Sequence, residues 1–423
     1  MSAPRLPMKP LMSLGDALAE LIGFAVTLDG VESVSTFEAD GRVLAQDLVS
    51  ALQVPPEDNS SMDGYAVRCT DVVQALRESL SDSPELPVSQ RIAAGTSGAP
   101  LLPMSAARIF TGAQIPLGAD AVVMQEDCEV LASDTSASSV RIKAVPMPGQ
   151  WLRCAGEDIR QGALVLAKGD RLTPAELGLA ASIGMDFLPV ARRPRVALFS
   201  TGDELVMPGA VPPEQMKPGA IYNSNRFFLR ALLLRLGCAV SDLGIVPDQL
   251  DATVQALRAA AQNHDLILTS GGVSVGEEDH IKPAVQSLGS LDLWQIAIKP
   301  GKPFAYGRVQ SAHFIGLPGN PVSSFVTFLL LVRPFLLKLQ GASQVTMKSS
   351  AATAHFTWAR ADRRREFLRV RRNAAGGLDL FANQSSGVLT SAVWADGLVD
   401  NPPGQTIAVG DVVSFIPFSE LLG

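Results

Sequence analysis

The sequence has little of what marks several common classes of protein. Its four cysteines, in 423 residues, lie far apart and form no C-x-x-C pair, so neither a disulfide framework nor a cysteine zinc site is indicated. The four histidines show no H-E-x-x-H or H-x-x-H spacing, which argues against metal binding by histidine. No G-x-x-x-x-G-K-S/T motif is present, and no G-x-G-x-x-G follows a strand-like run. The chain is therefore neither a P-loop NTPase nor an ordinary dinucleotide enzyme.

Charged residues are also sparse, at 18%, and the formal net charge is −7. Proteins that hold a nucleic-acid backbone concentrate Lys and Arg, so nucleic acid is not expected as the main partner, although residues 360–372 form a local basic run. The most apolar segment, 325–337, is too short to span a bilayer and is expected to be a buried helix, not a membrane anchor. Residues 1–10 have no apolar core and are expected to form a loose tail, not a signal peptide. A cytoplasmic protein with reduced thiols fits these features.

The apolar fraction of 47% is enough to bury sizeable cores, and the length suggests about two to four domains. From residue 195 onward, short β-rich runs alternate with helical patterns. This alternation predicts βαβ units and a mostly parallel, doubly wound α/β sheet. Strands are expected at 196–200, 240–246, 266–269, 293–298, 304–306 and 314–317, and helices near 226–236, 250–261, 281–288 and after Pro321.

The regions on either side have a different character. Residues 13–22 are expected to form a helix capped by Ser13. Residues 46–149 are rich in Val, Pro, Gly and Ser, with short strand-like runs, and predict a mainly β module. A helical pattern returns at 173–183. The chain from about residue 345 is again β-like and is expected to form a small barrel or sandwich.

The segment 269–279 carries the strongest sign of chemistry. It follows an apolar strand-like run and places three glycines and several hydroxyl groups ahead of three carboxylates. Glycines let backbone N–H groups approach a phosphate closely. The carboxylates would repel that phosphate unless a divalent ion, held by Asp279 or a neighbour, lies between them. An ordinary glycine-rich turn with a solvated acidic end explains this segment equally well.

Other segments that follow strands are expected at the same edge of the sheet, where ligands bind in folds of this type. Together they supply two lysines, further carboxylates and a helix N-terminus opened by Pro321, which suits a phosphorylated ligand with Mg²⁺. Each residue also has a simpler explanation: Asp248 is placed to cap a helix, and Lys299 and Lys302 could be solvated loop charges. The segments are 200–204, 246–248, 269–279, 299–303 and 316–324.

Seven blocks of sequence stand out, at 55–67, 108–113, 156–159, 200–204, 270–274, 299–303 and 316–321. They resemble the molybdopterin molybdenumtransferases, the family of MoeA and the gephyrin E-domain. They occur in the family's order, and the resemblance spans residues 13 to about 420, nearly the whole chain. One such block would be weak evidence, but seven in order are specific.

The resemblance implies a homodimer of four-part chains and a Mg²⁺-dependent reaction. In that reaction molybdate is inserted into adenylylated molybdopterin, and the adenylyl phosphoanhydride is cleaved to release AMP and molybdenum cofactor. A molybdopterin adenylyltransferase and cofactor-accepting molybdoenzymes are then expected as partners. The implied parts are an elongated first domain (11–45 with 150–192), an inserted mainly β domain (46–149), an α/β molybdopterin-binding domain (193–344) and a C-terminal β-barrel (345–423).

The resemblance also implies roles for particular residues. Glu204, Asp248 and Asp279 match acidic positions expected to organise Mg²⁺ and a water. Asp63 and Thr111 match catalytic positions that the family places across the dimer interface, although a turn alone would explain Asp63. Positions expected to contact the pterin nucleotide or molybdate are Ser270, Gly271, Gly272, Ser274, Lys299, Lys302, Pro318, Pro321, Ser323, Arg369 and Ser386.

Two positions depart from the family's pattern. Gln295 stands where some members carry lysine, and Asn223 where many carry aspartate, so a charge is missing at each. Two other functions are also considered: an adenylyltransferase that shares the Gly-Gly-Val-Ser loop, and a non-catalytic scaffold. The additional modules on both sides of the α/β core argue against the first, and the full set of acidic residues argues against the second. Molybdate-dependent AMP release would distinguish the three.

Overall fold

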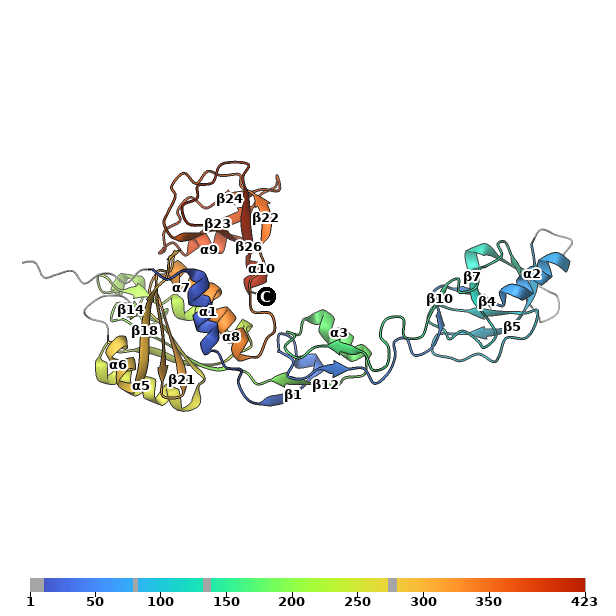
Figure 1. Cartoon of the computed structure of the whole chain (residues 1–423), viewed down its shortest axis with the longest axis horizontal. Coiled ribbons are helices and arrows are strands. Elements are labelled where there is room, and N and C mark those ends of the chain that lie inside the picture. The colour runs from blue at the N-terminus through green and yellow to red at the C-terminus, as the bar shows by residue number, and fades with distance from the viewer. Residues whose placement is uncertain (1–10, 79–82, 132–137, 273–279, 423) are drawn as a thin grey trace, which may run out of the picture. The chain divides into compact units, whose positions relative to one another are not determined.

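The computed structural model describes residues 11–78, 83–131, 138–272 and 280–422, which fold into two compact units (Figure 1). The first unit contains the chain up to residue 46, residues 168–173 and the chain from 187 onward. The second contains 47–167 and 174–186. The four-part division implied by the resemblance is finer than this and stays a prediction.

A six-stranded sheet forms the centre of the first unit. Four strands pair in parallel, and two antiparallel pairs follow at one edge, so that five strands run in one direction and one runs against them; this confirms the predicted mostly parallel α/β sheet. The order is β16 (Ala239–Val246), β13 (Arg195–Thr201), β17 (Leu266–Ser270), β21 (Ala312–Leu317), β20 (Pro303–Val309) and β18 (Gly289–Gln295).

Successive residues of the central strands face two different cores, because side chains alternate along a strand. Val196 and Leu198 of β13 face one core with α4 (Asn225–Arg235) and the helix that begins at Pro321. Ala197 and Phe199 face the other, with α5 (Leu250–Asn263) and α6 (Ile281–Leu288). Helices on both faces leave the strands buried on both sides, which explains their continuous apolar runs. The sheet is doubly wound, as predicted.

The expected buried helix spans α7 (Pro321–Thr327), the π-helical segment η4 (Phe328–Val332) and α8 (Arg333–Leu339). These 19 residues are long and apolar enough to cross a membrane, but 89% of their most apolar window is buried inside the protein. The N-terminal helix α1 (Leu14–Phe24) packs on them through Leu14, Ala17 and Leu21. This helix is therefore a core element of the first unit, as predicted, but the expectation that it is too short to span a bilayer is wrong, because the helix extends beyond 325–337 at both ends.

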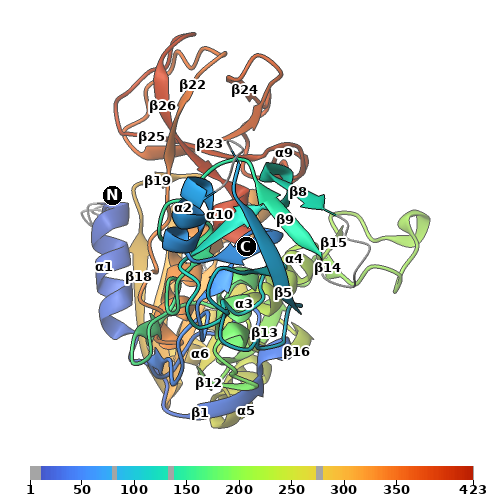
Figure 2. The ribbon, with the colours of Figure 1, turned by 90° about the vertical axis from the view of Figure 1, so that its right-hand side faces the viewer.

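The C-terminal residues form a second sheet in the same unit. Its edge strand comes from outside the C-terminal region: β19 (Ile298–Lys299) pairs in parallel with β23 (Arg365–Arg372) and lies beside it in Figure 2. The predicted strand 293–298 is thus divided, because Gln295 ends β18 while Ile298 begins β19. The order is β19, β23, β25 (Gly397–Asn401), β26 (Val412–Pro417) and β22 (Ser350–Thr353), with β24 (Leu378–Leu380) on the side of β23.

Smaller elements complete the first unit. The strands β1 (Val31–Ser35) and β12 (Phe187–Ala191) form an antiparallel pair, although they are far apart in the sequence. The other short elements are the 3-10 turn η1 (Thr36–Glu38), the parallel pair β14 (Leu205–Val206) and β15 (Ile221–Tyr222), the 3-10 turn η3 (Pro213–Gln215), and the helices α9 (Thr390–Trp394) and α10 (Phe418–Leu422).

The second unit is built around a six-stranded sheet, in agreement with the mainly β module predicted from its composition. Its strands follow the order β7 (Ala121–Met124), β4 (Gly64–Val67), β6 (Ala106–Ile109), β5 (Glu85–Ile92), β9 (Ser139–Ile142) and β8 (Cys128–Leu131). The other elements are α2 (Cys69–Glu78), α3 (Pro174–Ser182), the 3-10 turn η2 (Gln125–Asp127), and the short pairs β2 (Leu48–Val49) with β11 (Leu164–Leu166) and β3 (Asn59–Ser60) with β10 (Leu152–Arg153).

We predict that Gly64→Ala destabilises the second unit by about 1–3 kcal/mol, because a Cβ at this position would overlap the Val123 carbonyl oxygen across the β4–β7 pair. Gly178→Ala in α3 is the control, since its Cβ would meet nothing within 4 Å and removing a helical glycine gains about 0.5–1 kcal/mol. Urea unfolding of both variants checks this. If Gly64→Ala were as stable as the wild-type protein, the β4 and β7 backbones would be able to move apart without loss of stability, which would contradict this prediction.

Candidate functional site

A cleft of about 760 Å³ opens at the carboxyl ends of β13, β17 and β21. This is the edge where the sequence predicted a shared site, and open parallel sheets bind ligands there. Pro303 also reaches it, because β20 runs antiparallel to β21 and therefore begins where β21 ends. The lining residues are Thr201, Gly202, Glu204, Leu205, Ile221, Tyr222, Asn223, Ser224, Asn225, Asp248, Ser270, Gly271, Gly272, Pro303, Pro318, Gly319, Asn320, Pro321 and Gly387.

Two glycines after β17 form one wall of the cleft. Gly271 and Gly272 have φ angles of +94° and +66°, in the left-handed region that side chains disfavour. There is also no room for a side chain, since a Cβ on Gly271 would lie 3.1 Å from the Thr201 carbonyl oxygen and one on Gly272 would crowd Ile281. Both glycines line the cleft, but the Gly271 N–H group already donates to the Leu317 carbonyl oxygen at 3.1 Å, so this group is occupied by the chain itself. Ser274 and Asp279, from the same loop, lie outside the described residues.

A buried amide ties two loops of the cleft together. Asn225 Nδ2 donates to Ser270 Oγ at 2.8 Å and to the Gly319 carbonyl oxygen at 2.7 Å. Ser270 Oγ in turn donates to the Pro318 carbonyl oxygen at 3.3 Å. The loops after β17 and β21 are therefore fixed relative to each other. Sequence reasoning missed Asn225, whose signal in the sequence is an amide side chain at the first position of α4.

Glu204 and Asp248 both line the cleft, and neither carboxylate has a hydrogen bond or ion pair with the part of the chain that the structure describes. Asp248 does not cap α5, because the N-cap residue is Gln249 and no side-chain cap bond is made. The described residues contain no group of three or more His, Cys, Asp or Glu side chains that could hold a metal. Two carboxylates nevertheless suit Mg²⁺, which takes one or two of them plus substrate oxygens. The site thus fits this ion.

The helix N-terminus contributes less than its sequence suggested. Pro318 and Pro321 line the cleft, and Ser323 is 5% exposed in the first turn of α7. The Val322 N–H group already donates to the Ser386 carbonyl oxygen at 2.9 Å. One of the N–H groups expected to meet an anion is therefore occupied by the chain itself. The predicted contributions of Ser323 and Ser386 stay predictions.

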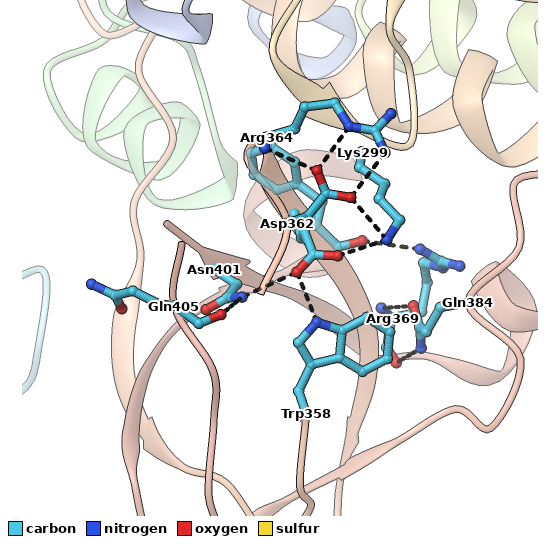
Figure 3. Close-up of polar contacts among 10 residues, drawn as sticks. Lys299, Trp358, Asp362, Arg364, Arg369, Gln384, Asn401 and Gln405 are labelled. Carbon is cyan, nitrogen blue, oxygen red and sulfur yellow. Dashed lines mark hydrogen bonds and ion pairs between the residues drawn. The ribbon is translucent and has the colours of Figure 1, made fainter. Parts of the chain in front are cut away.

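The three cations predicted to bind the anion are not among the residues that line the cleft. Lys299 lies between two carboxylates: its Nζ is 2.9 Å from Glu366 Oε1 and 3.2 Å from Asp362 Oδ2 (Figure 3). Lys302 is half-buried, and its carbonyl oxygen accepts the Ile296 N–H group at 2.8 Å. Sequence reasoning missed Glu366 and Asp362, since no spacing rule links them to Lys299.

Arg369 on β23 is 1% exposed and lies close to the polar network of Lys299 in Figure 3. Its guanidinium donates to Ser391 Oγ at 3.2 Å and to the Phe367 carbonyl oxygen at 3.0 Å. It forms no ion pair with a described carboxylate, and burial lowers its pKa to about 10. The group still carries its charge at neutral pH. A buried, charged guanidinium without a carboxylate suits an anion, but its role as a ligand stays a prediction.

Asp63 and Thr111 lie together in the second unit. The Thr111 backbone N–H and Oγ1 both donate to Asp63 Oδ1, at 2.8 and 2.7 Å. These bonds, the backbone one first, hold the pKa of the Asp63 carboxyl below its ordinary value, with a further contribution from the Arg108 charge. Asp63 is therefore an ionised, fixed and solvent-accessible carboxylate. The sequence had marked both residues without showing that they pair.

Comparisons with known proteins match almost the whole chain. Three family models cover it in order: the MoeA N-terminal region (domain I and II) at residues 12–184, a probable molybdopterin binding domain at 197–338 and the MoeA C-terminal region (domain IV) at 351–418. The chain is 40% identical to a molybdopterin molybdenumtransferase of Haemophilus influenzae, over 93% of this chain and 95% of that one. It is 37% identical to molybdopterin molybdenumtransferase 2 of Mycobacterium tuberculosis, over 88% and 90%.

Solved structures agree with the sequence comparisons. The molybdopterin biosynthesis moeA protein from Pyrococcus horikoshii OT3 aligns with a TM-score of 0.82 at 28% identity, covering 96% of this chain and all of that one (100%). The predicted fold class is thereby confirmed.

We predict that Asp248→Ala lowers the free energy of unfolding by much less than the ~1 kcal/mol typical of a lost N-cap, because the Asp248 side chain does not cap α5. Ser13→Ala is the matched control: Ser13 caps α1 by accepting the Asp16 N–H group at 3.1 Å, so about 1 kcal/mol should be lost. Chemical unfolding of both variants measures the difference. A cost at Asp248 as large as that at Ser13 would contradict the structure at this site.

Proposed function

Because this chain belongs to the MoeA family of molybdopterin molybdenumtransferases, we propose that it inserts molybdate into adenylylated molybdopterin in a Mg²⁺-dependent reaction that releases AMP. Its general class is established by its relatives: the chain is a transferase of molybdenum cofactor biosynthesis. The observation that most supports the finer proposal is the cleft at the strand ends, which is lined by the two glycines and by two carboxylates that have no partner among the described residues.

The size and polarity of the cleft suit a large, phosphorylated ligand. Ligand pockets commonly enclose about 300–1,000 Å³, and this one, at about 760 Å³, lies in the upper part of that range. The Gly271 N–H group is used by the Leu317 carbonyl oxygen, so the backbone of Gly272 is the group proposed to approach a phosphate oxygen. Asn225 ties Ser270, which precedes these two glycines, to the loop at Gly319. These contacts give the proposed pyrophosphate-binding site a fixed backbone geometry.

Glu204 and Asp248, with Asp279 from the loop outside the described residues, are proposed to hold Mg²⁺. The bound ion would neutralise charge on the pyrophosphate while its adenylyl bond is cleaved. The two carboxylates would repel a phosphorylated substrate without such a cation. Activity should therefore depend on both the carboxylates and the ion.

The anionic co-substrate, molybdate, needs directed donors. Lys299, Lys302 and Arg369 are proposed to supply them, together with Ser323 and Ser386. Arg369 is suited to this because a guanidinium donates two parallel hydrogen bonds to an oxyanion. The uncharged Gln295 and Asn223 leave the proposal unchanged, since no step of it depends on them.

We further propose that the chain acts as a cytoplasmic homodimer whose sites are completed by the partner subunit. Asp63, held by Thr111, is an exposed carboxylate in the second unit, whereas the cleft belongs entirely to the first. A twofold dimer in which each second unit serves the partner's cleft would create two identical composite sites. A molybdopterin adenylyltransferase and acceptor molybdoenzymes remain the proposed partners for substrate and product.

The function is tested by incubating the protein with adenylylated molybdopterin, molybdate and Mg²⁺ and measuring AMP. We expect AMP release that requires both molybdate and Mg²⁺, and a loss of about 100-fold or more in Asp248→Ala, since charge stabilisation at a reacting phosphate has effects of this size. Ser13→Ala should retain full activity. Consumption of the substrate without molybdate, or formation of the adenylylated pterin from ATP, would contradict the proposal.

Shared sites predict complementation between inactive variants. Asp63→Ala and Asp248→Ala homodimers should each be nearly inactive if both residues serve the reaction. A co-expressed heterodimer, purified through two different tags, should recover activity, because one of its two sites receives both intact residues. If each site were built within one chain, every site in the heterodimer would carry a lesion, and its activity would stay at the level of the parents.

A further inference from the structure

Glu366 is a buried carboxylate with three side-chain donors around it (Figure 3). Its side chain is 1% exposed. Oε1 accepts a hydrogen bond from Lys299 Nζ at 2.9 Å, while Oε2 accepts one from Trp358 Nε1 at 2.7 Å and one from Asn401 Nδ2 at 3.3 Å. These donors come from β19, from the segment before β23 and from β25. Both oxygens of Glu366 are thus occupied by groups from separate parts of the chain.

Lys299 is the cation that makes this burial tolerable. A carboxylate removed from water is strongly unfavourable unless it is paired. Among the described residues, Lys299 alone forms an ion pair with Glu366. The second carboxylate beside Lys299, Asp362, is different: its side chain is 22% exposed and it is also held by Arg364 at 2.9 Å. Glu366 therefore depends on Lys299 more than Asp362 does.

The position of Lys299 in the chain connects this pair to the cleft. Lys299 ends β19, and the short segment 299–303 leads directly to Pro303, which lines the cleft. Parallel pairing places Lys299 opposite Glu366 on β23. One end of this segment is thus fixed in the C-terminal sheet and the other forms part of the cleft wall. A lysine ammonium has three donor hydrogens, so two carboxylate contacts leave one for a further acceptor.

We propose that Glu366 is a positioning residue that orients Lys299, and with it the segment 299–303, for molybdate. This inference rests on the proposed function, because Lys299 is assigned to molybdate there. Glu366 does not contact the substrate: it is buried beneath Lys299 and has no free oxygen. Glutamine cannot replace it, since an amide nitrogen in place of either oxygen would meet an N–H donor.

A double-mutant cycle separates positioning from general structural damage. The variants are Glu366→Gln, Lys299→Met and the double variant, with Asp400→Asn as the matched control. Asp400 is also a carboxylate facing β23 and is ion-paired with Arg365, but it has no contact with Lys299. Calorimetry measures the dissociation constants for molybdate and, separately, for AMP. AMP release by the wild-type protein tests the proposed function independently of these variants.

We expect Glu366→Gln to weaken molybdate binding about tenfold and to change AMP binding less than twofold. The double variant should bind molybdate as Lys299→Met does, because Glu366 has no effect once Lys299 is absent. Asp400→Asn should bind both ligands normally. If Glu366→Gln does not fold, Glu366→Asp replaces it as the test. Aspartate keeps the charge but is shorter, so it shifts the Lys299 ammonium. We expect it to weaken molybdate binding by less than tenfold and to leave AMP binding unchanged.

Additive losses in the double variant, or equal losses for molybdate and AMP, would overturn the inference and leave Glu366 with a structural role only. Unchanged molybdate binding in a folded Glu366 variant would overturn it as well. A wild-type protein that binds molybdate but releases no AMP would contradict the proposed function and leave the positioning role intact.

Discussion

Parallel pairing of β13, β17 and β21 is the constraint on which the candidate site depends. Because the strands run in the same direction, the loops that follow them emerge at one edge of the sheet, although the first begins after Thr201 and the last after Leu317. Cores on both faces keep these strands buried and aligned. The Asn225 amide then fixes two of the loops to each other. Weakening any of these features would separate the glycine wall from the carboxylates.

The first unit contains two charged regions with opposite arrangements. At the cleft, Glu204 and Asp248 have no partner in the part of the chain that the structure describes, which suits a cation and, through it, a phosphate. At the junction with the C-terminal sheet, the cation Lys299 is surrounded by carboxylates instead. The acidic cleft and this constrained lysine are joined by the segment that ends at Pro303. A substrate with two anionic parts could use both regions at once.

Much of the fold follows from the sequence by simple rules. The helices α4, α5 and α6 and the strands β13, β16 and β17 lie where periodicity placed them, because each has one strong pattern and a clear boundary. The division of 293–298 between two sheets was not predictable, since an apolar run does not tell which partner strand it will meet. The N-cap explanation of Asp248 also fails, because helix α5 begins two residues later than that carboxylate.

The site was predictable in part, and for a physical reason. Loops after parallel strands share an edge, so Glu204, Asp248 and Gly271 could be grouped from the sequence. The contacts of Lys299 with Glu366 and of Asp63 with Thr111 depend on long-range packing that no local pattern encodes.

The central claim is that Glu204 and Asp248 hold the reaction's divalent cation beside the glycine wall. The most direct measurement is anomalous X-ray diffraction from crystals grown with AMP and Mn²⁺, which replaces Mg²⁺. The account predicts an anomalous peak within roughly 2.0–2.3 Å of an oxygen from one or both carboxylates and of a phosphate oxygen. A nucleotide bound in the cleft with the metal elsewhere, or with no metal at all, would contradict it.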